Sequence, residues 1–241
     1  MHPIERLRAV ARAREVDQAL LAREAAGVLG SFAGDLPGLV TSCRRLLDRH
    51  PTAGALWWTC SRLLAAGDVR AEARAIGHDL RDEPATIALS LDLPGEAVVA
   101  VLPDPAGGSE LAGELNAWRD DLVVAHGPGA LRAPRDEPRV LLVEAGAAGP
   151  DGFVAAEGTA DEIAAARDAG VAVWLVVDVG RRLPRVLFEA LVARAQAPGA
   201  APGAAAPPIE IVPTTVAERV VEPRRVDCPV APELLRARGG W

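Results

Sequence analysis

The sequence predicts an α/β protein in which an N-terminal helical domain, residues 1–83, is followed by a Rossmann-like domain with a mostly parallel sheet, residues 84–241. Apolar residues recur at helical spacing as far as residue 81, and short β-rich apolar runs joined by helical segments follow them. Runs that are apolar throughout are typical of parallel strands buried on both faces. The period changes near Pro84, and a proline disfavours helix continuation at the residue before it.

Helical periodicity is clearest in three stretches of the N-terminal domain. The apolar positions are Leu36, Leu39, Val40, Cys43, Leu46 and Leu47, then Leu56, Trp57, Cys60, Leu63 and Leu64, then Val69, Ala73, Ile76 and Leu80. Glycine or proline breaks leave short connections, so neighbouring helices are expected to pack antiparallel. We expect Trp57 and Leu63 to be buried between helices, with Cys43 and Cys60 as small buried apolar residues.

Five apolar runs are candidate strands in the second domain. They cover residues 97–102, 122–125, 140–143, 171–177 and 209–212. Thr159 and Glu162 have the spacing of a capping box, which predicts a helix that starts there and ends before Gly170. Residues 195–208 are rich in alanine, glycine and proline and have few large side chains, so we expect an exposed loop before the last strand.

Composition and charge exclude several classes of protein. Half of the 241 residues are hydrophobic, which is enough for a buried core. The formal charge of -7 argues against a nucleic-acid or anionic-membrane binder, and the absence of lysine excludes Schiff-base chemistry and a Walker A loop. Three scattered cysteines fit a reducing compartment. With no long apolar run and no signal-peptide core, a cytoplasmic protein is expected.

Most motifs for catalysis, cofactors and metals are missing. The four histidines are never at helical ligand spacing. Gly127 and Gly129 lack the third glycine of a dinucleotide-binding fingerprint, and Ser109 lacks the second glycine of a nucleophile elbow, because Leu111 stands there. We therefore expect no metal and no cofactor. Glu144 and Asp151 flank a loop at the end of a predicted strand, a favourable place for chemistry in an open α/β sheet. They are the candidate catalytic residues.

Two predicted helix starts form a candidate anion site. Gly107, Gly108 and Ser109 follow one strand and begin a helix, and Gly158 and Thr159 stand in the same arrangement at another helix start. Unpaired amides and the positive end of the helix dipole favour an anion such as a sugar phosphate. The alternative is that these glycines serve only tight turns.

Several stretches together resemble a known family. They are residues 140–177 with Gly158-Thr159 and the strand from Gly170, the segment His50-Pro51-Thr52-Ala53 followed by Leu56-Trp57, and residues 209–213 with 219–222 after them. This chain is similar to the family that contains the alpha, beta and delta subunits of eukaryotic translation initiation factor 2B, methylthioribose-1-phosphate isomerase and ribose-1,5-bisphosphate isomerase. The resemblance implies a NagB/RpiA/CoA transferase-like Rossmann fold, a homodimer and a phosphorylated small-molecule ligand, with Gly146 among the ligand-binding residues.

The sequence departs from the family at its catalytic positions. The isomerases have a cysteine in the loop after the first Rossmann strand, where this chain has Leu-Pro-Asp-Pro at 102–105. They have an aspartate in a Gly-Ala-Asp loop, where this chain has Ala-Gly-Ala at 145–147. The cation before Gly-Thr is also replaced, by Ala-Glu at 156–157. Both catalytic residues that the resemblance implies are therefore absent.

Two functions remain open. The first is a non-catalytic or divergent initiation factor 2B-like protein that binds a sugar phosphate or nucleotide. The second is a sugar-phosphate aldose-ketose isomerase with a relocated acid/base pair, which would be favoured if Arg132, Arg181 and Arg182 converged on one pocket. A role related to translation would rest on fold-level analogy alone. No membrane and no direct nucleic-acid partner is expected.

Overall fold

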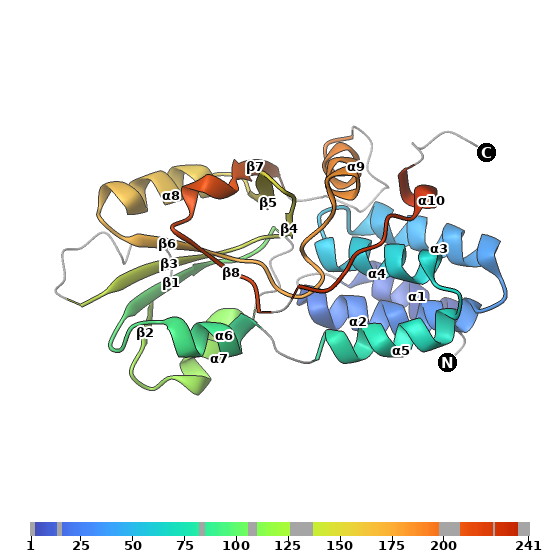
Figure 1. Ribbon diagram of the computed structural model, residues 1–241, viewed down its shortest axis with the longest axis horizontal. Coiled ribbons are helices and arrows are strands. Elements are labelled where there is room, and N and C mark those ends of the chain that lie inside the picture. Colours follow the sequence, from blue (N-terminus) through green and yellow to red (C-terminus); the bar gives the residue numbers. More distant parts are fainter. Residues whose placement is uncertain are drawn as a thin grey trace.

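The computed structural model describes residues 3–13, 16–81, 85–105, 110–125, 137–197, 208–223 and 225–235. Figure 1 shows a helical part beside a sheet part. The helical part holds α1 (Pro3–Arg12), α2 (Gln18–Leu29), η1 (Gly30–Phe32), α3 (Leu36–Arg49), α4 (Gly54–Ala65) and α5 (Val69–Asp79). No strand occurs before residue 98 in the described part of the chain, as the helical periodicity predicts. No described helix is long and apolar enough to span a membrane.

Aspartates begin three of these helices and a tryptophan-rich helix fills their core. Asp17, Asp35 and Asp68 accept hydrogen bonds from amides in the first turns of α2, α3 and α5. Trp57 and Leu63 of α4 are fully buried, as expected. The indole nitrogen of Trp57 donates to the carbonyl of Pro51 over 3.1 Å, which satisfies its one polar group.

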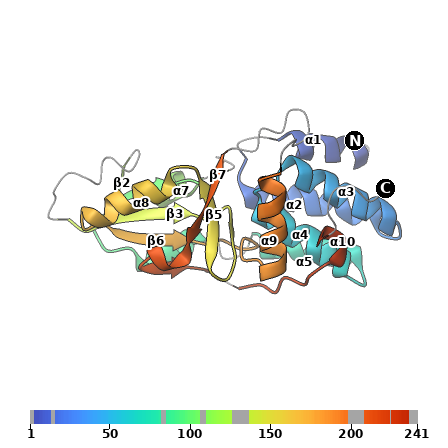
Figure 2. The ribbon, with the colours of Figure 1, turned by 90° about the horizontal axis from the view of Figure 1, so that it is seen from above.

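Two helices from the end of the chain complete this core. They are α9 (Arg185–Ala195) and α10 (Pro232–Leu235), and Figure 2 shows α9 against the N-terminal helices. Leu187, Leu191 and Leu234 are buried in the same apolar cluster as Trp57. The division of the chain at residue 83 stays a prediction, and the helical core draws on residues from both sides of it.

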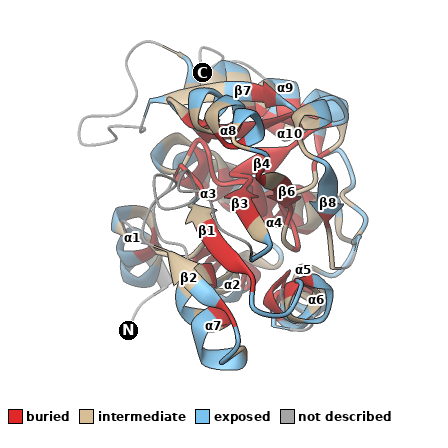
Figure 3. Ribbon diagram, turned by 90° about the vertical axis from the view of Figure 1, so that its left-hand side faces the viewer, coloured by how far each residue is buried: buried red, intermediate tan, exposed pale blue. Residues whose placement is uncertain are grey.

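The main sheet has the order β2-β1-β3-β6-β8, and every described pair in it is parallel. Its strands are β1 (Val98–Leu102), β2 (Val123–Ala125), β3 (Arg139–Glu144), β6 (Ala172–Val176) and β8 (Arg219–Val221). Figure 3 shows that β1 and β3 are buried over most of their length, whereas the edge strand β2 is not. The α/β class with a mostly parallel sheet is therefore confirmed.

Each face of the main sheet has a different cover (Figure 1). Helices α6 (Ala85–Asp92) and α7 (Leu111–Trp118) pack on one face through Leu89 and Leu115. Helix α8 (Thr159–Asp168) covers the other face together with a small antiparallel sheet of β4 (Ala147–Ala148), β5 (Gly152–Ala156) and β7 (Ile209–Pro213). The layers leave the carboxyl ends of β1, β3 and β6 facing the helical part.

One local expectation is confirmed and one is corrected. The run at 209–212 forms a strand as expected, and this strand, β7, pairs antiparallel with β5 in the small sheet, whereas β8 takes the edge of the main sheet. The capping box is wrong: Gly158, with φ of 90°, is the N-cap of α8, and Thr159 is already helical. Glu210 of β7 accepts the Ala160 amide over 2.6 Å and supplies the cap from a distant part of the chain.

Replacing Trp57 by alanine is expected to lower the free energy of unfolding by about 3–5 kcal/mol, because it leaves a large cavity in a core that cannot collapse fully. Trp118→Ala is the matched control, because that side chain lies at the end of α7 and is 62% exposed. Urea denaturation measures both variants, and the control is expected to stay within about 0.5 kcal/mol of the parent. Equal losses for the two variants would mean that the core is wrongly assigned.

Candidate functional site

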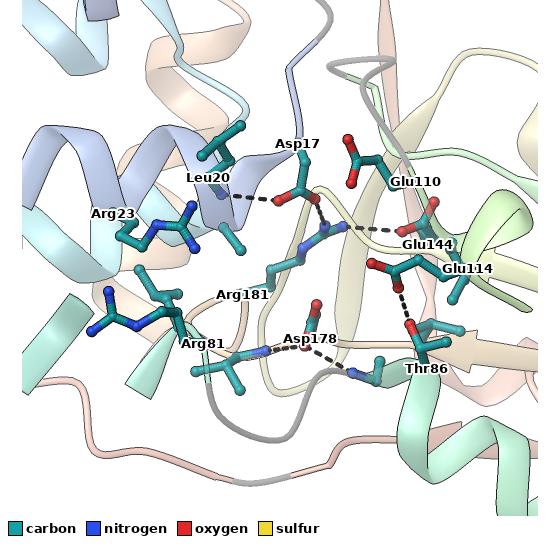
Figure 4. A pocket seen from close by; sticks show the side chains of 16 residues that line it. Asp17, Leu20, Arg23, Arg81, Thr86, Glu110, Glu114, Glu144, Asp178 and Arg181 are labelled. Atoms are coloured by element: carbon teal, nitrogen blue, oxygen red, sulfur yellow. Dashed lines mark hydrogen bonds and ion pairs between the residues drawn. The ribbon is translucent and has the colours of Figure 1, made fainter. Parts of the chain in front are cut away.

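A cavity of about 270 Å³ lies where the helical part meets the carboxyl edge of the main sheet. Open α/β sheets place ligands at this edge. Side chains from α2, α6 and α7, from the end of α5 and from the ends of β3 and β6 form its wall. The charged residues of the wall are Asp17, Arg23, Arg81, Glu110, Glu114, Glu144, Asp178 and Arg181 (Figure 4). We call this cavity the junction pocket.

Arg181 lies at the centre of the inner wall of the junction pocket and is only 2% exposed. Its Nη1 donates to the carbonyl of Ala145 over 3.0 Å and lies 3.1 Å from Asp104 Oδ2 and 3.7 Å from Glu144 Oε1. Its Nη2 lies 3.6 Å from Asp17 Oδ2. Asp104 follows β1 and Glu144 ends β3, whereas Asp17 belongs to the helical part. One guanidinium therefore joins carboxylates from both parts of the molecule.

The turn before Arg181 explains how the side chain reaches this position. Gly180 has φ of 78°, a conformation that favours glycine, and a Cβ there would lie 3.0 Å from the indole ring of Trp58. The turn is thus packed tightly against α4. Asp178 fixes its start, because its Oδ1 accepts the amides of Val179 over 2.8 Å and Ala85 over 3.3 Å.

Burial and charge shift two pKa values in the pocket. Burial raises the pKa of Asp178 above its ordinary value, and this outweighs the opposing attraction of Arg181. Burial by itself lowers the pKa of Arg181, but Asp104, Glu144, Asp178 and Asp17 together raise it above the ordinary value. Arg181 is therefore a permanent cation, and Asp178 holds its proton more tightly than an exposed aspartate does.

Charge is distributed unevenly around the junction pocket. Figure 4 shows Arg23 and Arg81 together on one side, and Glu110, Glu114 and Glu144 on the other, beyond Arg181. Within the part of the chain that the structure describes, neither Arg23 nor Arg81 forms an ion pair or a side-chain hydrogen bond. The pocket therefore has a cationic end and an acidic end.

The candidate catalytic residues lie in different places. Glu144 is 5% exposed and lines the junction pocket. The side chain of Asp151 is 74% exposed and lies 2.8 Å from Arg185, outside the pocket wall. Glu144 and Asp151 therefore do not form a pair.

The candidate ligand-binding residues are also separated. Gly107, Gly108 and Ser109 lie outside the described residues, although Glu110 and Leu111, which come directly after them, line the junction pocket. Gly158 and Thr159 start α8, where Glu210 already occupies the Ala160 amide, and neither residue belongs to the pocket wall. An anion shared by the two predicted helix starts therefore stays a prediction.

Gly146 has a packing role in this structure. Its carbonyl accepts hydrogen bonds from Gln18 Nε2 over 3.1 Å and from the Gly54 amide over 2.9 Å. A Cβ on Gly146 would lie 2.9 Å from Pro105 Cδ and 3.2 Å from the carbonyl of Thr52. Gly146 itself therefore has no room for a side chain, because the helical part packs directly on its backbone.

The three arginines singled out in the sequence do not converge. Arg181 lines the junction pocket, whereas Arg182 donates to Glu222 and to the Gly149 carbonyl elsewhere. Arg132 lies outside the described residues. Convergence of all three on one pocket, which would favour an isomerase, is therefore not found in the described structure.

Sequence reasoning missed Asp17, Arg23, Asp104 and Asp178. Asp104 and Asp178 each follow a parallel strand, which is the signal that selected Glu144, and the same reasoning applied to every strand would have found them. Asp17 and Arg23 reach the pocket only through packing between the two parts, for which the sequence carries no local signal. Among the described residues no group of three or more His, Cys, Asp or Glu side chains is placed to hold a metal ion.

The fold and the pocket define an α/β protein with a helical part set against the carboxyl edge of its sheet. Translation initiation factor eIF-2B from Pyrococcus horikoshii OT3 has a similar structure, with a TM-score of 0.64 at 12% identity over 91% of this chain and 94% of that chain. The tetrameric eIF2B-beta2-delta2 complex from C. thermophilum gives a TM-score of 0.61 at 15% identity over 91% and 88%. For 5-methylthioribose 1-phosphate isomerase from Pyrococcus horikoshii OT3 the TM-score is 0.54 at 14% identity over 90% and 82%.

These similarities establish the fold and confirm the fold that the sequence resemblance implied. No protein-family model matches the chain, and no curated protein matches it by sequence. At identities of 12–15%, function has to be argued from the junction pocket itself.

Asp178→Asn is expected to stabilise the protein at neutral pH. A carboxyl whose pKa is raised by folding does not destabilise the folded state below its ordinary pKa, near 3.8. The destabilisation grows as the pH rises from there through the raised pKa. The gain in melting temperature should therefore grow as the pH increases from about 4.

Asp121→Asn is the control with the opposite sign. Arg119 lowers the pKa of Asp121 to about 2, so this carboxylate stabilises the fold above pH 3.8 and the contribution is lost as the pH falls toward 2. This variant should be less stable than the parent at neutral pH and should approach it in acid. If the stability of both variants relative to the parent changes with pH in the same direction, the opposite pKa shifts assigned to Asp178 and Asp121 are contradicted.

Proposed function

We propose that this protein binds a small phosphorylated molecule in the junction pocket and that it lacks isomerase chemistry. The observation that carries the proposal is the pair Arg23 and Arg81, two guanidinium groups on one side of a cavity at the ligand-binding edge of the sheet. Guanidinium groups suit phosphate because they offer several N–H donors in a fixed plane and stay charged.

The size of the pocket supports a small ligand. Pockets for drug-sized molecules measure about 300–1,000 Å³, and this one measures about 270 Å³. A sugar monophosphate fits such a volume better than a dinucleotide. The similar fold of an isomerase named for 5-methylthioribose 1-phosphate supports the same class of ligand.

Two observations support binding without turnover. The cysteine position of the isomerase family falls in the Leu-Pro-Asp-Pro stretch at 102–105, and the aspartate position falls in the Ala-Gly-Ala stretch at 145–147. Aldose-ketose isomerisation needs an acid and a base at fixed geometry, and such groups commonly contribute about 10²–10⁴-fold each. Backbone amides and guanidinium groups can hold a phosphate without this acid and this base.

A second candidate function is an isomerase with a relocated acid/base pair. It is favoured by one observation: Glu144 and Asp178 both line the junction pocket, and Asp178 has a raised pKa, as a proton donor requires. Turnover of methylthioribose 1-phosphate or ribose 1,5-bisphosphate that is lost in Glu144→Gln but survives in Ser109→Ala would establish this candidate in place of the first.

The binding proposal predicts that ribose 5-phosphate raises the melting temperature whereas ribose does not. A ligand at 100 times its dissociation constant stabilises the folded state by about 2.7 kcal/mol. In the double variant Arg23→Gln/Arg81→Gln this shift should be lost, because both phosphate partners are gone.

The matched control is Arg70→Gln/Arg74→Gln, which removes two exposed arginines from α5 away from the pocket. It should keep the shift of the parent. If no sugar phosphate changes the melting temperature of the parent, or if the two double variants behave alike, the binding proposal fails.

The homodimer and the cytoplasmic location stay proposals. The similarity to subunits that assemble in a tetrameric complex supports self-association. Sedimentation equilibrium decides between the chain mass of 25.1 kDa and twice that value. A role related to translation has the support of fold analogy only.

A further inference from the structure

A second cavity, with a volume of about 370 Å³, lies on the helical part between α1 and α3. Its apolar floor consists of Leu7, Ala11 and Leu46, which belong to the helical core or pack against it. Figure 2 shows α1 beside α3 on the side of the molecule away from the sheet. None of the described residues in its wall also lines the junction pocket. We call this cavity the α1–α3 groove.

Arginines surround the apolar floor of the α1–α3 groove. The other residues of its wall are Arg8 from α1 and Arg45, Asp48 and Arg49 from α3. Asp48 Oδ1 lies 3.4 Å from Arg194 Nε, so the carboxylate of this set is engaged by a cation outside the wall. The groove is therefore positively charged, although the whole chain has a formal charge of -7.

Arg45 and Arg8 are available to an external anion. Within the part of the chain that the structure describes, Arg45 makes no ion pair and no side-chain hydrogen bond. It stands four residues before Arg49 on α3, and like charges at this spacing destabilise a helix, so an anion between them relieves repulsion. Arg8 lies 2.6 Å from Glu5, but both side chains are more than half exposed, so water weakens this pair.

We propose that the α1–α3 groove binds a small apolar carboxylate, with its hydrocarbon chain on the apolar floor and its carboxylate at Arg45 and Arg8. Ligand pockets commonly combine an apolar lining with a few polar groups that fix orientation. A guanidinium binds a carboxylate through two parallel hydrogen bonds, and the floor removes the hydrocarbon chain from water. A sugar phosphate lacks the apolar part and a neutral hydrocarbon lacks the charge, so neither complements both halves of the groove.

Isothermal titration of the full chain with octanoate and octan-1-ol tests the proposal, because the two compounds share a hydrocarbon chain and differ in charge. Octanoate is expected to bind about tenfold tighter or more, since its carboxylate gains charge-assisted hydrogen bonds. In Arg45→Gln the affinity for octanoate should fall severalfold, while the affinity for octan-1-ol stays the same. Arg70→Gln is the matched control, because Arg70 is exposed on α5 and does not line the groove.

Two further variants test the apolar floor and the location of the site. Ala11→Leu places a larger side chain in the groove and should weaken the binding of both compounds, with a melting temperature that shows the variant folded. Arg23→Gln/Arg81→Gln removes the cations of the junction pocket and should bind octanoate like the parent.

Equal affinities for octanoate and octan-1-ol, or no binding of octanoate at millimolar concentrations, would overturn the proposal. Equal octanoate affinities in Arg45→Gln and Arg70→Gln would also overturn it. Loss of octanoate binding in Arg23→Gln/Arg81→Gln would assign the carboxylate to the junction pocket instead. If sedimentation equilibrium shows that the parent self-associates and Arg45→Gln does not, a second copy of the chain covers the groove and the proposal is wrong.

Discussion

The buried guanidinium of Arg181 holds the two parts of this protein together. It contacts the ends of β1 and β3 through Asp104 and Glu144, and it reaches Asp17 at the start of α2. Because a buried charge needs partners on several sides, the strand ends, the turn after β6 and the first turn of α2 must all be in place at once. Hydrogen bonds from Gln18 and Gly54 to the carbonyl of Gly146 reinforce the same junction.

This arrangement determines what the pocket offers to a ligand. Arg181 is already engaged by carboxylates, so among the described residues of the pocket wall the cations available to a ligand are Arg23 and Arg81 on the other side. The packing that fixes the junction also leaves no room for a side chain at Gly146. The same contacts thus stabilise the fold and give the pocket a cationic and an acidic end.

The sequence predicted those features that local patterns encode. Uninterrupted apolar runs predicted β1, β3 and β6, and helical spacing predicted the burial of Trp57 and Leu63. The pairing of β7 with β5 was not predicted, because strand pairing depends on distant segments and an apolar run does not specify its neighbour. The cap of α8 was wrong for the same reason, since Glu210 arrives from β7.

Within the candidate site, the sequence indicates only the residues that lie at the ends of strands. Glu144 was found because it ends a strand, and Asp104 and Asp178 carry the same signal. Arg23 and Asp17 come from a helix that is joined to the sheet only by tertiary packing, so neither spacing nor composition indicates them. The helix start at 107–109 remains a prediction, because it lies outside the described residues next to the pocket wall.

The most direct test of this account is the free energy of unfolding of Arg181→Met as a function of pH, with Arg182→Met as the neighbouring control. Removing the cation leaves buried carboxylates without compensation, and breaking a buried ion pair in this way costs about 3–5 kcal/mol. A loss of this size is expected for Arg181→Met at neutral pH, shrinking in acid as the carboxylates take up protons, and a smaller loss is expected for Arg182→Met. If Arg181→Met is as stable as the parent at neutral pH, the junction between the two parts does not depend on this charge.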